Sequence, residues 1–187
     1  MSVNYFGMTE FLNALAPVLA KAEAPRAVLI SSFSSLQEND PALVEAMCID
    51  DDEAKARDLA QAIVDTAGPE AAQGLVYASS KRAVSRWVRR ESIKPQWAGA
   101  GIPLNAVGPG VIRTPMTAPW LESQQGQQYL MSVGPMPLNG FAEPEVVAEL
   151  MIWLASPANT HVTGQTVYVD GGADVAIRGE NVWDLRE

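Results

Sequence analysis

Three short apolar runs, each closed by small or turn-forming residues, constrain the fold more than any other feature of this chain. They are "AVLISS" at 27–32, "IPLNAVGPG" at 102–110 and "GQTVYVDGG" at 164–172, and helix-periodic segments separate them. Alternating strands and helices are typical of an α/β fold with a parallel sheet and crossover helices. Chemistry in such sheets gathers beyond the carboxyl ends of the strands. The residues predicted to meet there are Ser31–Ser35, Pro109-Gly110 and Gly171-Gly172.

Helical periodicity fills much of the chain between these runs. Apolar residues recur at helical spacing from Val3 to about Lys21, with Pro17 near the end of that segment. A second helix is expected through "YASSK" at 77–81, and a third at "EPEVVAELMIWLAS", whose first turn is acidic. The stretch from "VIRTPM" to Phe141 is rich in Pro and Gln, and we predict a long loop with little helix there.

The length of 187 residues is that of one domain. We interpret residues 1–187 as a single domain in which residues 36–74 form a helical insertion. That segment is polar and helix-prone, and it holds two expected short helices at "PALVEAM" and "DEAKARDLAQAIVDTAG". An acidic first turn from Asp50 to Glu53 suits the amino end of the second helix.

Charge and composition exclude several classes of function. The 22 acidic and 13 basic residues give a net charge of −9, which disfavours nucleic acid and anionic membrane surfaces as partners. No apolar run approaches the roughly 20 residues of a membrane span. The single cysteine, Cys48, excludes an intrachain disulfide and suggests a reducing, cytoplasmic compartment. Neither a dyad of Cys48 with the only histidine, His161, nor a metal site is expected.

Tyr77 and Lys81 are four residues apart, so on a helix their side chains face the same way. One interpretation is an ordinary solvated helix face. The other is a phenol beside a cation: a phenol is a poor base at neutral pH, and a lysine ammonium one turn away favours the phenolate. The serines after the first strand are equally ambiguous, because a serine there also suits a helix cap.

Taken together, the motifs resemble those of the short-chain dehydrogenase/reductase family. The resemblance rests on Asn4, Ser32, Tyr77 and Lys81 in that order, followed by "NAVGPGVIRTPM" and "VYVDGG". It extends over nearly the whole chain and implies a Rossmann-like, doubly wound parallel sheet. "VNYFG", the long polar insertion before Tyr77 and "VDGGADVAIR" resemble the bacterial branch of 3α-hydroxysteroid dehydrogenases and carbonyl reductases.

The resemblance implies an oxidoreductase that moves a hydride between NAD or NADP and a secondary alcohol or ketone. Tyr77 is implied as the acid/base, with Lys81 tuning it and holding the nicotinamide ribose. Ser32 is implied to bond the substrate oxygen, and Asn4 to anchor a water that relays protons to Lys81. Further implied cofactor contacts are Pro109, Gly110, Val111, Ile112 and Thr114. Met116 and Trp120 follow Thr114, and we expect them to contact an apolar substrate such as a steroid.

One family feature is absent from these 187 residues. Members of the family begin with a strand and a glycine-rich turn, GxxxGxG, that holds the cofactor pyrophosphate at a helix amino end. We therefore expect an N-terminally truncated, partial dinucleotide-binding domain that lacks the first strands and the residues separating NAD from NADP. The alternative function is a catalytically inactive remnant that acts as a folded or interaction module.

Loss of the first strands has a structural consequence. The strand "AVLIS" is expected to present an open edge, and apolar faces of the first helix and of the strands are expected to lose their cover. Open edges and apolar patches favour self-association, so a homo-oligomer is predicted.

Overall fold

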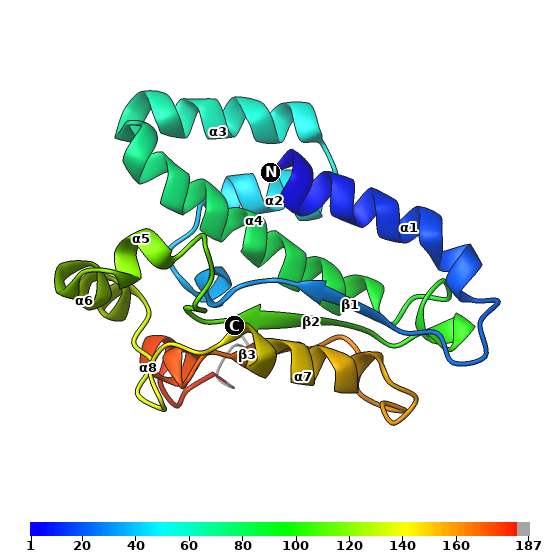
Figure 1. Cartoon of the computed structure of the whole chain (residues 1–187). Helices are drawn as coiled ribbons and strands as arrows, with labels where there is room; N and C mark the ends of the chain where they lie inside the picture. The colour runs from blue at the N-terminus through cyan, green and yellow to red at the C-terminus, as the bar shows by residue number, and fades with distance from the viewer. Residues whose placement is uncertain (183–187) are drawn as a thin grey trace.

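The computed structural model describes residues 1–182, and at its centre is a three-stranded parallel sheet of order β1-β2-β3 (Figure 1). The strands are β1 (Ala27–Ile30), β2 (Leu104–Pro109) and β3 (Thr166–Val169). In the register, Ala27 lies opposite Leu104, and Ala106 lies opposite Thr166. The three apolar runs are therefore strands, and the parallel α/β architecture predicted from them is confirmed.

Helices cover both faces of the sheet (Figure 1). The long α4 (Pro69–Glu91) contacts one face, and α7 (Pro144–Ala155) contacts the other. Neighbouring residues of β2 point to opposite faces, as the pleat requires. Accordingly, Ala106 is buried in the core cluster that contains α4, whereas Val107 is buried in the cluster that contains α7.

The chain begins with a π-helical turn, η1 (Ser2–Gly7), which continues into α1 (Met8–Leu19). Two short helices, α2 (Pro41–Cys48) and α3 (Glu53–Ala67), follow β1 at the positions that the sequence predicts. Each has an aspartate cap: Asp40 accepts the N–H of Leu43 at 2.7 Å, and Asp52 accepts the N–H of Lys55 at 2.9 Å. Three shorter elements are η2 (Phe33–Leu36), η3 (Ala98–Ala100) and α8 (Ala173–Arg178).

The prediction of a long loop with little helix up to Phe141 was wrong. That segment contains α5 (Ala118–Leu121) and α6 (Gln124–Val133). The hydroxyl of Ser123 caps α6 by accepting the N–H of Gly126 at 3.0 Å. On one side of α6, Leu130 and Met131 pack against a small core formed by Phe33, Val111, Met136 and Ala173. The weak helical signal of the Gln-rich segment is thus supported by tertiary packing.

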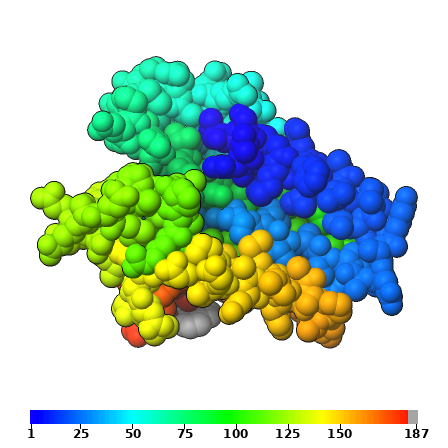
Figure 2. All heavy atoms as spheres, in the orientation of Figure 1, coloured from blue at the N-terminus to red at the C-terminus, as the bar shows by residue number. Residues whose placement is uncertain are grey.

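Strand β1 lies at the edge of the sheet, because within residues 1–182 it pairs with β2 alone. Its segment is visible at the surface between α1 and α7 (Figure 2). Apolar side chains nearby are open: Phe11 and Val18 of α1 are 63% and 59% exposed, and Ile30 of β1 is 40% exposed. The expected open edge and uncovered apolar face are both present.

No helix within residues 1–182 combines the length and the apolar character that crossing a bilayer requires.

Candidate active site

The carboxyl ends of the three strands lie side by side. The N–H of Ser31, just after β1, donates to the carbonyl of Val107 in β2 at 2.7 Å. The N–H of Gly110, just after β2, donates to the carbonyl of Val169 in β3 at 2.9 Å. Therefore the serine cluster, the Pro109-Gly110 turn and the Gly171-Gly172 turn gather, as predicted, beyond the carboxyl ends of the strands.

Tyr77 and Lys81 lie one turn apart on α4 and face the same way. The Nζ atom of Lys81 is 5.8 Å from the centre of the Tyr77 ring. Tyr77 is 41% exposed, whereas Lys81 is only 8% exposed. The phenol is thus open to a ligand, while the ammonium is held within the protein beside it.

The buried ammonium of Lys81 connects α4 to the end of β1. Its Nζ atom donates to the carbonyl of Ile30 at 3.0 Å, and it makes no ion pair with any residue in 1–182. Burial without a counter-charge lowers the pKa of Lys81 from its ordinary value. An ammonium has three N–H donors, so two remain for a ligand such as a ribose, after the bond to Ile30.

The two serines after β1 have different hydrogen bonds. The hydroxyl of Ser31 donates to the carbonyl of Lys81 at 3.2 Å and lies 2.9 Å from the hydroxyl oxygen of Ser85. The hydroxyl of Ser32 accepts the N–H of Ser34 at 3.1 Å and so caps η2. The helix-cap interpretation therefore holds for Ser32. Because this hydroxyl only accepts, its own hydrogen is free to be donated to a ligand.

Asn4 lies in η1 and lines a groove together with Tyr77 and Ser80. The groove has a volume of about 610 Å³. Its other wall comes from α3 and the start of α4, within the segment 36–74 or next to it. The polar residues of that wall, which the sequence did not single out, are Arg57, Gln61 and Gln73. Nothing in their spacing distinguishes them from the exposed face of an ordinary helix.

The residues implied as cofactor contacts form the exit from β2. Val111 is buried, and its N–H lies 3.2 Å from the sulfur of Met136. Ile112 forms an isolated parallel bridge with Ala142. The N–H of Thr114 donates to the hydroxyl of Thr117 at 3.0 Å, and this turn leads into α5. Main-chain N–H groups of this segment are therefore bonded to both side-chain and main-chain acceptors, beyond the carboxyl end of β2.

Met116 and Trp120 are exposed and lie apart from the groove. Met116 is 81% exposed, and Trp120, in α5, is 46% exposed. Neither is among the residues that line the groove with Asn4 and Tyr77. The chain fold brings Asn4 and Tyr77 to one groove and Lys81 to the end of β1, but it does not bring these two apolar side chains to that groove.

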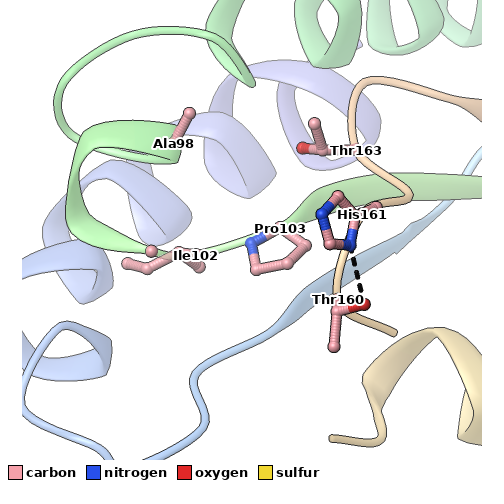
Figure 3. A pocket seen from close by; sticks show the side chains of 7 residues that line it. Ala98, Ile102, Pro103, Thr160, His161 and Thr163 are labelled. Atoms are coloured by element: carbon pink, nitrogen blue, oxygen red, sulfur yellow. Dashed lines mark hydrogen bonds between the residues drawn. The ribbon is translucent and has the colours of Figure 1, made fainter. Parts of the chain in front are cut away.

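The single histidine, His161, lies beside Pro103 at the amino end of β2 (Figure 3). It lines a small pocket of about 160 Å³ with Pro103, which precedes β2, and its Nδ1 atom is 2.8 Å from the hydroxyl of Thr160. Cys48, the last residue of α2, is buried in the main core cluster. No group of three or more His, Cys, Asp or Glu side chains suited to a metal ion occurs within residues 1–182.

The sequence matches a family model described as enoyl-(acyl carrier protein) reductase over residues 56–174. This match and the relatives below show that the chain belongs to the short-chain dehydrogenase/reductase family. Within the family, it is 38% identical over 183 residues to the 3α-hydroxysteroid dehydrogenase/carbonyl reductase of Comamonas testosteroni. That alignment covers 95% of this chain and 66% of the relative, so the chain spans about two thirds of the relative's length.

Solved structures show the same fold. The 3α-hydroxysteroid dehydrogenase of a Pseudomonas species, complexed with NADH, has a TM-score of 0.78 and 34% identity, and the match covers 96% of this chain and 67% of that one. The NADP complex of Pseudomonas aeruginosa RhlG has a TM-score of 0.64 at 22% identity, over 91% of this chain and 56% of that one, and it supports the fold alone. The Rossmann-like class predicted from the sequence is confirmed.

Proposed function

We propose that this chain carries the catalytic part of an NAD(P)-dependent oxidoreductase that interconverts a secondary alcohol and a ketone. The observation that carries the proposal is the placement of Lys81, whose Nζ atom lies 5.8 Å from the Tyr77 ring and bonds the carbonyl at the end of β1. The buried cation therefore connects the exposed phenol of α4 to the strand end that Ser31 and Ser32 follow. Proton transfer at a substrate oxygen requires such a set.

In this proposal Tyr77 exchanges the proton of the substrate hydroxyl. The ammonium of Lys81 lies beside the phenol with no paired carboxylate within residues 1–182, so its charge can stabilise the negative charge that develops during proton transfer. Ser32 donates its free hydroxyl hydrogen to the substrate oxygen and stabilises the charge that develops there. Ser31 is the weaker candidate, since its hydrogen is directed at the carbonyl of Lys81.

Asn4 is proposed to hold a water at the open side of Lys81 and Tyr77. It lines the groove that reaches Tyr77, and this groove is large enough for several waters. Through that water, protons pass between Lys81 and solvent. Asn4 is a positioning residue in this scheme, because the water and the lysine separate it from the reacting atoms.

NAD or NADP is the proposed cofactor, and it supplies the hydride acceptor or donor. The two free N–H donors of Lys81 suit ribose hydroxyls. The segment from Pro109 to Thr114 follows β2 at its carboxyl end, on the same side of the sheet as the end of β1 that Lys81 bonds. The proposal assigns Pro109, Gly110, Val111, Ile112 and Thr114 to the nicotinamide side. Support comes from the related 3α-hydroxysteroid dehydrogenase of a Pseudomonas species, whose solved structure is a complex with NADH.

The proposed substrate class is a hydroxysteroid or a ketone of similar size. The name of the Comamonas testosteroni relative and the volume of the groove beside Tyr77 support it. Met116 and Trp120 do not line that groove, so the proposal keeps them as substrate contacts outside it, on the segment after Thr114. Their exposure leaves both side chains free to contact an apolar ligand.

The test is steady-state oxidation of a 3α-hydroxysteroid with NAD and with NADP, in the wild type and in Tyr77→Phe. Loss of the phenol hydroxyl removes the acid/base, so we expect kcat to fall by about 10²–10⁴-fold. Tyr129→Phe, which removes the hydroxyl of an exposed tyrosine on α6, is the matched control and should retain full activity. Turnover by Tyr77→Phe at the wild-type rate contradicts the proposal.

The inactive remnant is the second candidate, because the 187 residues contain no GxxxGxG turn. Titration of the folded chain with NADH and NADPH, followed by protein fluorescence, separates the two candidates. Micromolar binding favours the enzyme. A cooperatively folded chain that neither binds cofactor nor turns over substrate favours the remnant.

A further inference from the structure

The end of β1 contacts Lys81 twice, through two consecutive residues. The carbonyl of Ile30 accepts a hydrogen bond from the ammonium of Lys81 at 3.0 Å. The hydroxyl of Ser31 donates to the main-chain carbonyl of the same lysine at 3.2 Å. The main chain of Lys81 and the charged tip of its side chain are therefore both attached to one strand end.

Ser31 is itself held firmly in place. It is 2% exposed, and its main-chain N–H donates to the carbonyl of Val107 in β2 at 2.7 Å. Its Oγ atom lies 2.9 Å from the Oγ atom of Ser85, which is one helical turn beyond Lys81. A hydroxyl has a single hydrogen, and that of Ser31 is directed at Lys81, so Ser85 donates to Ser31. The bonds form a chain from Ser85 through Ser31 to Lys81.

The side chain of Lys81 needs such support. An ammonium on a flexible four-carbon stem loses rotamer freedom when it is held in one place. Within residues 1–182 no carboxylate pairs with Lys81 to fix its tip. The position of its Nζ atom, 5.8 Å from the centre of the Tyr77 ring, is therefore sensitive to how α4 meets the end of β1.

The bond from Ser31 fixes that meeting in a way that packing does not. Apolar contact between α4 and the sheet is non-directional, whereas a hydrogen bond requires its donor and acceptor to be aligned. The hydroxyls of Ser79 and Ser80 donate to carbonyls within α4 itself, so they do not join the helix to the strand. Ser31 joins the two elements, and it does so at the main chain of Lys81.

We propose that Ser31 is a positioning residue, which keeps the ammonium of Lys81 beside Tyr77 by holding the main chain of this lysine against the end of β1. This role rests on the proposed oxidoreductase function. It gives the two neighbouring serines different tasks, because Ser32 bonds the substrate oxygen whereas Ser31 touches neither substrate nor cofactor. A misplacement of a charged group by about 1 Å lowers a rate by up to about 10²-fold.

The variant Ser31→Ala removes the hydroxyl, and Ser31 does not line the groove beside Tyr77. At saturating cofactor, we expect kcat for oxidation of a 3α-hydroxysteroid to fall by about 10–100-fold. The KM for the steroid should stay within about twofold of the wild type, because the lysine charge acts on the transition state rather than on the bound substrate.

Two other serines provide matched controls. The hydroxyl of Ser92 donates to the carbonyl of Arg89 in α4, also at 3.2 Å, and Ser92 is 1% exposed. Ser92→Ala therefore removes a similar buried bond and should show a similar loss of stability with the wild-type kcat. Ser85→Ala shortens the chain of hydroxyls but leaves the bond from Ser31 to Lys81 intact, so its kcat should also stay close to the wild-type value.

The reactivity of the Lys81 amine tests the positioning without turnover. Lys81 is 8% exposed, so acetic anhydride should label it slowly in the wild type, as followed by mass spectrometry of peptides. Ser31→Ala should be labelled several-fold faster at Lys81, and Ser92→Ala at the wild-type rate.

The two measurements separate this role from the proposed function. Unchanged labelling of Lys81 in Ser31→Ala, wild-type kcat in that variant, or an equal loss of kcat in Ser92→Ala overturns the role of Ser31. A wild-type chain that oxidises no steroid instead contradicts the proposed function, and the labelling rates alone then decide whether Ser31 holds Lys81.

Discussion

At the scale of the residue, Lys81 is the side chain on which the candidate site depends. A lysine that is 8% exposed and has no counter-ion within residues 1–182 is unusual, because burial penalises its charged form. The carbonyl of Ile30 offsets part of that cost. The protein therefore keeps at this position a cation that destabilises the fold, a pattern typical of functional sites.

This burial predicts a pH dependence of stability. The pKa of Lys81 is lowered in the folded protein, whereas the unfolded chain has the ordinary value of about 10.4. Between these two values the unfolded state binds more protons, so the contribution of Lys81 to the free energy of unfolding rises with pH in that window. Below the lowered pKa the burial cost is present in full. Urea unfolding at a series of alkaline pH values should show a steeper rise for the wild type than for Lys81→Met, and equal slopes would contradict the argument.

Gly110 is required by close packing at the end of β2. A Cβ atom added there would lie 2.8 Å from the Cα of Asp170 and 2.9 Å from the sulfur of Met136. We expect Gly110→Ala to lower the free energy of unfolding by about 1–3 kcal/mol, measured by urea titration. The control is Gly99→Ala, whose added Cβ meets Pro95 at an ordinary 3.5 Å. A Gly110→Ala protein as stable as this control would show that the turn can relax.

At the scale of the element, α4 organises the molecule. One side of the helix presents Tyr77 and Lys81 to the candidate site, and another presents Arg82, Arg86 and Arg89 to a groove of about 570 Å³ beside β3. Its middle is buried against β2 and the core through Ala83, Val84, Trp87 and Val88. The helices of the segment 36–74 pack on it, since α2 and α3 both contact α4. That residues 36–74 form an insertion stays a proposal, and these contacts place its helices against α4.

Asp40 begins α2 and also bonds α4, and its side chain tests the contribution of the α2 cap. Its carboxylate accepts the N–H of Leu43, and its own N–H donates to the hydroxyl of Ser79 in α4 at 2.9 Å. Asp40→Ala removes the cap and should cost about 1 kcal/mol of unfolding free energy. Asp58→Ala changes an exposed aspartate within α3 and should shift stability by no more than about 0.5 kcal/mol in a thermal or urea melt. Equal losses of unfolding free energy in the two variants would show that the Asp40 cap does not stabilise the protein.

At the scale of the whole molecule, the open edge of β1 predicts self-association. Phe11 and Val18 lie on one face of α1, seven residues apart, and both are largely exposed, as is part of Ile30. An unpaired strand edge beside apolar side chains favours contact between copies. We expect the apparent mass in analytical ultracentrifugation to rise with protein concentration.

The double variant Phe11→Gln/Val18→Gln should reduce that rise, because it removes apolar surface while leaving the core unchanged. Ile93→Gln alters a single exposed residue after α4 and serves as the control. A wild-type chain that stays monomeric at every concentration would refute the prediction of a homo-oligomer. An equal effect of the control would instead place the contact elsewhere.

The sequence predicted the regular elements where local chemistry is strong. The strands at 27–30, 104–109 and 166–169 follow from apolar runs, and α2 and α3 follow from helix-prone stretches, the second with an acidic first turn. It failed at α6, whose Gln-rich sequence has little local preference and whose Leu130 and Met131 find their partners far away in the chain. It also missed Arg57, Gln61 and Gln73 in the wall of the groove, because spacing along a helix does not reveal what faces it.

By itself, the sequence determined the parallel α/β class, the family, and the pairing of Tyr77 with Lys81, because each depends on intervals along one chain. Only the tertiary structure decided that Lys81 is buried against Ile30, that Ser32 caps η2, and that Arg82, Arg86 and Arg89 face a strand edge. These facts depend on which distant segments meet, and hydrophobic burial, a non-directional force summed over the whole core, sets those meetings.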